Sequence, residues 1–150
     1  METSQANPFL KQFKGSFVSI LRWPQLDALW QTLRKQNDGQ WYLYAVGEAV
    51  PTQPAGTDQL DNFISEIDTL LRREHDEDYC GIVYVDDTQS PTFIKIYDPN
   101  NLGVSCGFSL HPPLPGWILC RAVPSDLAQA TAPPAGRRRW WQRLFTVSPS

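Results

Sequence analysis

The sequence predicts one α+β domain with a single mixed, largely antiparallel sheet of five or six strands and two helices on one face. Two β-rich segments alternate with two segments of helical periodicity, and the segments that follow indicate strands alone. The resulting order is β-α-β-α-β-β-β-β, in which the front half suits crossover connections and the back half a meander. A chain of 150 residues is long enough to bury a core without disulfides or metals.

Residues 24–37 are predicted to form the first helix. Pro24 presets the backbone of a first helical turn, and Asn37-Asp38-Gly39 supplies a stop. The apolar side chains recur at helical spacing and form one stripe, made of Leu26, Leu29, Trp30 and Leu33.

Residues 58–74 are predicted to form the second helix, with Thr57 or Asp58 as its N-cap. Asp68 and Arg72 form an ion pair at the favourable i,i+4 spacing. The apolar stripe consists of Leu60, Phe63, Ile64, Ile67, Leu70 and Leu71. The acidic run that follows this helix, residues 74–78, opposes the helix dipole and could hold a hard cation or take part in acid–base chemistry, or simply be a solvated helix end.

Six segments have the composition of strands, namely 16–22, 40–46, 79–85, 92–97, 104–108 and 117–121. The segment 40–46 is apolar on both faces, so we expect an interior strand covered on both sides. A short turn-rich link joins 79–85 to 92–97, which predicts an antiparallel hairpin.

The chain divides into four parts by composition. Residues 1–14 are expected to be a flexible lead-in, with Phe9, Leu10 and Phe13 available to pack on the body. Residues 15–127 form the globular domain, 128–136 an Ala/Pro-rich linker, and 137–150 a basic aromatic tail.

Charge and cysteine content limit the classes of function. Residues 48–98 contain 12 acidic and 3 basic side chains, so the body repels nucleic-acid phosphates and we expect no nucleic-acid partner. The odd number of cysteines, three, disfavours a disulfide framework and suits a reducing cytoplasm. The N-terminus lacks the pattern of a secretion signal, and no apolar run has the length of a membrane span. We therefore expect a cytoplasmic protein.

The tail is the most specific feature of the sequence. On a helix with about 100° per residue, one side gathers Trp140, Trp141, Leu144 and Phe145, and the other Arg138, Arg139, Gln142 and Arg143. Arg137 breaks this division. We expect a non-enzymatic binding module in which Arg138, Arg139, Trp140, Trp141, Arg143, Leu144 and Phe145 contact a protein partner or an anionic membrane surface. Two alternatives remain open: the tail folds back onto its own acidic body, or it stays disordered.

A small enzyme or metal-dependent protein is the alternative function. Its chemistry would come from His75, Asp78, Asp86 and Cys106 near the strand ends, where acids, an imidazole and a thiol follow one another. The spacing matches no metal, phosphate-loop or serine-hydrolase motif, so we predict no metal site and no cofactor. A homo-oligomer is a further possibility, because an exposed subset of the many aromatic residues would mark a contact surface.

Overall fold

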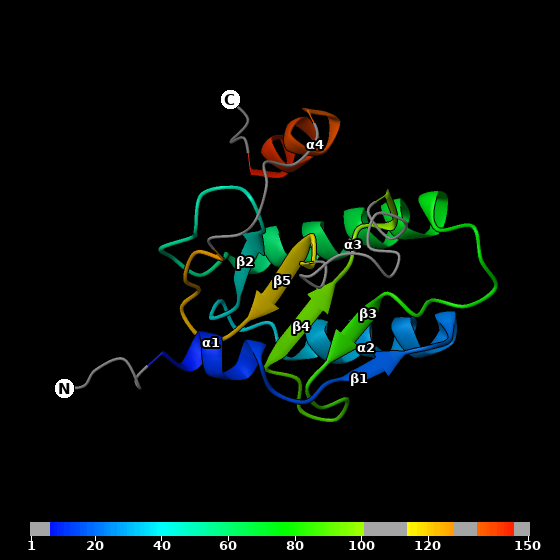
Figure 1. The fold of residues 1–150 in the computed structure, drawn as a ribbon, viewed down its shortest axis with the longest axis horizontal. Coiled ribbons are helices and arrows are strands. Elements are labelled where there is room, and N and C mark those ends of the chain that lie inside the picture. Colours follow the sequence, from blue (N-terminus) through cyan, green and yellow to red (C-terminus); the bar gives the residue numbers. More distant parts are fainter. Residues whose placement is uncertain (1–6, 101–113, 128–134, 146–150) are drawn as a thin grey trace, which may run out of the picture.

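A computed structural model describes residues 7–100, 114–127 and 135–145 of the chain (Figure 1). Its helices are α1 (Pro8–Phe13), α2 (Trp23–Lys35), α3 (Thr57–Glu74) and α4 (Ala135–Phe145). Its strands are β1 (Val18–Ile20), β2 (Tyr42–Ala45), β3 (Val83–Val85), β4 (Phe93–Ile96) and β5 (Trp117–Cys120). The segment 104–108, for which we expect a strand, lies outside the described residues.

The five strands form one sheet in the order β1-β3-β4-β5-β2, and every neighbouring pair is antiparallel. The predicted α+β class is confirmed, as is the hairpin of β3 and β4, in which Val83 pairs with Ile96. The predicted crossover connections in the front half would have placed parallel strands side by side. Instead β1 and β2 lie at opposite edges of the sheet, and the described strands pair only in the antiparallel sense.

Strand β2 is an edge strand, so the interior position expected for residues 40–46 is wrong. Its side chains are nevertheless buried on both faces, with Leu43 on the face of α2 and α3 and Tyr44 on the other. Helices and loops can cover both faces of a strand whether it lies at the edge or in the interior of a sheet. The apolar pattern therefore could not distinguish an edge strand from an interior strand.

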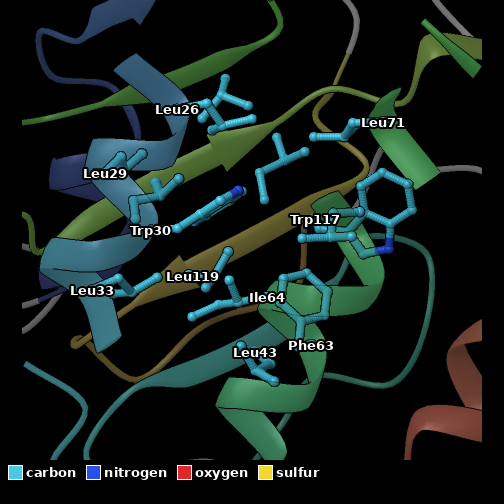
Figure 2. Packing of buried hydrophobic residues seen from close by; sticks show 14 of the residues in the cluster. Leu26, Leu29, Trp30, Leu33, Leu43, Phe63, Ile64, Leu71, Trp117 and Leu119 are labelled. Atoms are coloured by element: carbon cyan, nitrogen blue, oxygen red, sulfur yellow. The ribbon is translucent and has the colours of Figure 1, made fainter. Parts of the chain in front are cut away.

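The main core lies between the sheet and the pair α2 and α3 (Figure 2). Both predicted apolar stripes point into it, and Leu26, Leu33 and Leu60 are fully buried. The second helix begins at Thr57, one residue earlier than expected, and its N-cap is Gly56 rather than Thr57 or Asp58. The side-chain oxygen of Gln59 accepts from the Gly56 N–H at 2.9 Å and satisfies one end of the helix.

Helix α1 covers the opposite face of the sheet, although residues 1–14 were expected to be a flexible lead-in. Phe9 is fully buried and its ring centroid lies 5.4 Å from that of Phe93. The Asn7 side chain accepts from Leu10 N at 3.1 Å, and Lys95 Nζ donates to Phe13 O at 2.7 Å. A cap at one end and a cation at the other offset the low intrinsic stability of so short a helix.

Candidate binding surface around the C-terminal helix

Helix α4 lies beside α3, at one side of the sheet (Figure 1). It packs on the body through the aromatic side of the predicted tail. Trp140 is only 7% exposed. Its ring centroid lies 5.5 Å from that of Trp117 on β5 and 6.3 Å from that of Phe63 on α3. Trp141 meets Phe63 at 6.0 Å, edge to face, and Leu144 packs against the same core. The described part of the tail, residues 137–145, therefore takes the fold-back arrangement among the alternatives.

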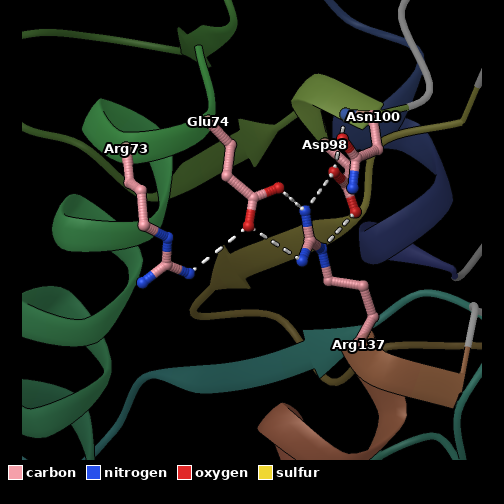
Figure 3. Close-up of polar contacts among 5 residues, drawn as sticks. All are labelled: Arg73, Glu74, Asp98, Asn100 and Arg137. Carbon is pink, nitrogen blue, oxygen red and sulfur yellow. Dashed lines mark hydrogen bonds and ion pairs between the residues drawn. The ribbon is translucent and has the colours of Figure 1, made fainter.

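Arg137 fixes the start of α4 to the body through two carboxylates (Figure 3). Its Nε donates to Asp98 Oδ2 at 2.9 Å and its Nη2 to Asp98 Oδ1 at 3.1 Å. Nη1 donates to Glu74 Oε2 at 3.3 Å, and Nη2 also donates to Glu74 Oε1. The Asn100 N–H orients Asp98 from the other side at 2.9 Å. We call Arg137, Glu74 and Asp98 the clamp.

The clamp is largely removed from water, with side-chain exposures of 13% for Arg137 and 6% for Asp98. The hydrogen bonds from Arg137 lower the pKa of Glu74 against the opposing effect of burial. Burial disfavours the charged form of Arg137, but the hydrogen bonds to Asp98 and Glu74 outweigh it and raise its pKa. Glu74 and Arg137 each stabilise the charged form of the other, which is the condition for a stable buried ion pair.

The outer side of α4 is polar and faces solvent, with Arg139, Gln142 and Arg143 all exposed. Arg139 and Arg143 are one helical turn apart, and neither forms an ion pair with another described residue. The side chains of Arg138 and Phe145, also predicted as contact residues, lie outside what the structure describes. Self-docking thus divides the predicted contact set into an inner aromatic side and an outer basic side.

A groove of about 670 Å³ opens beside α4. Leu43 of β2 contributes to its lining, together with Gln59 of α3 and residues 48–55 apart from Val50. Trp141 and Gln142 of α4 complete the lining. Its volume falls within the range of ordinary ligand sites. No helix among the described residues has the length and apolar character needed to cross a bilayer.

The residues of the alternative enzyme site occupy separate places. His75 is the C-cap of α3, and its Nε2 lies 2.8 Å from the carbonyl oxygen of Cys80, before β3. Asp86 follows β3 and accepts from Thr92 N and Phe93 N at 2.9 and 3.0 Å. Asp78 is exposed, and Cys106 lies outside the described residues. Within the described part of the chain no three His, Cys, Asp or Glu side chains come close enough to hold a metal.

No family model, curated protein or solved structure matches this chain. Sequence reasoning did not identify Asp98 and Phe63 as partners of the tail, because contacts between distant segments leave no local pattern. Two signals in the sequence could have found the clamp, although they were not connected: Arg137 interrupts the apolar side of α4, and Glu74 opposes the dipole of α3.

Proposed function

We propose that this protein is a non-enzymatic binding module that contacts an acidic surface of a partner protein through the outer side of docked α4. The observation that carries this proposal is the exposure of Arg139 and Arg143 on a helix whose aromatic side is already packed on its own body. Their spacing of one turn aims both guanidinium groups in one direction, so they can meet carboxylates on a single surface.

Docking favours such a contact because it removes much of the cost of ordering the tail. A free segment of about ten residues is a marginal helix in water, and ordering it would offset most of the energy gained on binding. The body already holds α4 through the clamp and through Trp140, so the partner meets a formed helix. A reducing compartment such as the cytoplasm suits the proposal, because buried Cys80 and Cys120 are free thiols.

Binding to a defined acidic probe tests the proposal. The full chain is titrated into a fluorescein-labelled glutamate-rich peptide, and the double variant R139E/R143E is compared with the matched variant K11E/K14E. Lys11 and Lys14 are also exposed but belong to α1 and its C-cap, on the other face of the sheet. We expect R139E/R143E to weaken binding about tenfold, since each exposed ion pair contributes up to about 1 kcal/mol, and K11E/K14E to leave it nearly unchanged.

Equal loss in both variants would show that only overall charge matters and would refute a binding surface on α4. The same proteins are mixed with phosphatidylserine-containing vesicles. Binding to vesicles without binding to the peptide would assign the outer side of α4 to a membrane surface instead.

A further inference from the structure

The outer edge of β1 forms one margin of the sheet, and β2 forms the opposite margin (Figure 1). At β2 the chain covers its own edge, because Ala55 N donates to Trp41 O and Glu48 N donates to Ala45 O. No described backbone segment runs along the outer edge of β1 in this way. An uncovered strand edge presents donors and acceptors with which a further strand can pair.

The backbone groups that this edge leaves free belong to Phe17 and Ser19. Ile20 O accepts from Gly81 N at 2.8 Å, so the backbone of Ile20 faces β3. The alternation of an antiparallel strand then turns the backbone of Phe17 and of Ser19 outward. No described residue forms a hydrogen bond with the N–H or C=O of either one. The edge therefore offers two donors and two acceptors.

Leu21 also points outward, but its backbone groups are already occupied. Its N–H donates to Gln25 Oε1 at 3.1 Å, and its carbonyl oxygen accepts from Cys80 N at 2.8 Å. The free part of the edge thus ends before Leu21.

The side chains on this edge are uncharged and largely apolar. Residues 15–21 contain no charged side chain and no proline. Among the described residues four large apolar side chains are exposed, and two of them stand here, Val18 at 53% and Leu21 at 56%. The nearest charged residues, Lys14 and Arg22, are the C-cap of α1 and the N-cap of α2. The edge lacks the charges and prolines that keep strands from pairing, and its complement is another uncharged strand.

We infer that two copies of this chain associate through their β1 edges, as antiparallel strands related by a two-fold axis at Val18. Phe17 of each copy then pairs with Ser19 of the other, and the four free groups of each edge form four hydrogen bonds. An axis at Ser19 would instead place Phe17 opposite Leu21, whose backbone groups already have partners. The occupied groups of Leu21 therefore set the register.

The same register covers the exposed side chains. The two Val18 side chains face each other as a non-hydrogen-bonded pair, the kind in which opposite side chains come closest. They lie on the side of the main core, because Ile20, two residues further along the strand, points into that core. On the other face Leu21 becomes a diagonal neighbour of Phe17 of the partner subunit. The contact thus covers both apolar side chains that a single copy leaves exposed on this edge.

Sedimentation equilibrium of the full chain tests the inference, and we expect a reversible dimer. V18K places two like charges directly opposite each other and should raise the dissociation constant of the dimer about tenfold. Val123 is 61% exposed and lies after β5, so V123K is the matched control and should leave the dissociation constant unchanged. Added salt should strengthen the dimer, because Lys14 and Arg22 bring like charges to both ends of the pairing.

A pair of opposite charges tests the register. V18E should weaken the dimer as V18K does, whereas an equimolar mixture of the two variants should recover it, since a lysine then lies directly opposite a glutamate. Recovery would also show that both variants fold.

A chain that stays monomeric up to about 1 mM, equal effects of V18K and V123K, or a mixture that does not recover would overturn the inference. Loss of the dimer in R139E/R143E but not in V18K would also overturn it. That result would assign self-association to the basic side of α4 on the acidic body of a second copy.

Discussion

Arg137 Nε lies 2.9 Å from Asp98 Oδ2, although 39 residues separate the two in the chain. This pair closes the clamp on which the docking of α4 rests, and Glu74 completes it at the end of α3. The carboxylate of Glu74, unfavourable at a helix C-terminus by itself, becomes favourable when Arg137 neutralises it. Helix α4 is thus an integral part of the fold of this protein.

Replacing Arg137 by alanine is expected to reduce the free energy of unfolding by about 2–3 kcal/mol, because buried Asp98 loses its countercharge. R143A removes an exposed arginine from the same helix and is expected to change the free energy of unfolding by less than about 0.5 kcal/mol. Urea unfolding followed by circular dichroism measures both. Similar midpoints for the two variants would mean that the clamp does not hold α4.

Replacing Trp140 by alanine tests the aromatic packing that holds α4 on the body. W140A removes contacts with Phe63 and Trp117, and buried Trp-to-Ala changes commonly cost about 3–5 kcal/mol. We expect α4 to open locally in this variant while the sheet stays folded, so that tryptic cleavage at the arginines of α4 accelerates by about a hundredfold. W140F keeps an aromatic ring, so its rate of tryptic cleavage is expected to lie between those of W140A and the unaltered chain. Cleavage of the unaltered chain as fast as W140A would contradict the docked arrangement.

Acid is expected to weaken the clamp through Glu74. Arg137 holds the pKa of this carboxyl below its ordinary value of 4.5 in the folded chain. The stabilisation is therefore complete above that ordinary value and is lost as the pH falls through the lower folded pKa. E74Q removes this contribution, so its urea midpoint should decline less than that of the unaltered chain between pH 6 and about pH 3.

The matched control for this pH dependence is E66Q, which changes an exposed glutamate on the same helix. It should retain the steep decline of the unaltered chain. A decline in E74Q as steep as that in E66Q would show that Glu74 does not link the clamp to pH.

Cys80 and Cys120 are expected to be unreactive in the folded protein. Both are fully buried, and burial raises the pKa of Cys80 and raises that of Cys120 to about 12. Since the thiolate is the reactive form, the variant C106A should show no thiol that reacts with Ellman's reagent in the native state and two in urea. Rapid reaction of the native variant would mean that one of these thiols is accessible.

Local periodicity was sufficient to predict the two long helices, because their core-facing side chains repeat at helical spacing. Leu26, Leu29, Trp30 and Leu33 do form the buried stripe of α2. The strand order was beyond such reasoning, since the buried side chains of β2 look the same whether the strand is interior or, as found, at an edge. Helix α1 is too short for a periodic signal, and its stability comes from Phe93 and Lys95, far along the chain.

The tail shows the same limit for the candidate site. Its amphipathic pattern identified an aromatic side that must be covered, but the pattern is equally suited to a membrane, a partner or the chain's own body. Arg137 interrupts the aromatic side, and the pattern alone gave it no role; in the structure it needs carboxylates within the covering surface. The body supplies them in Glu74 and Asp98.

The most direct test of the docked tail is a measurement of nuclear Overhauser contacts in solution from the Trp140 indole to the rings of Phe63 and Trp117. The account requires both contacts, together with an indole N–H that exchanges slowly with solvent. Their absence, with the Trp140 resonances at the positions of an unstructured peptide, would contradict it.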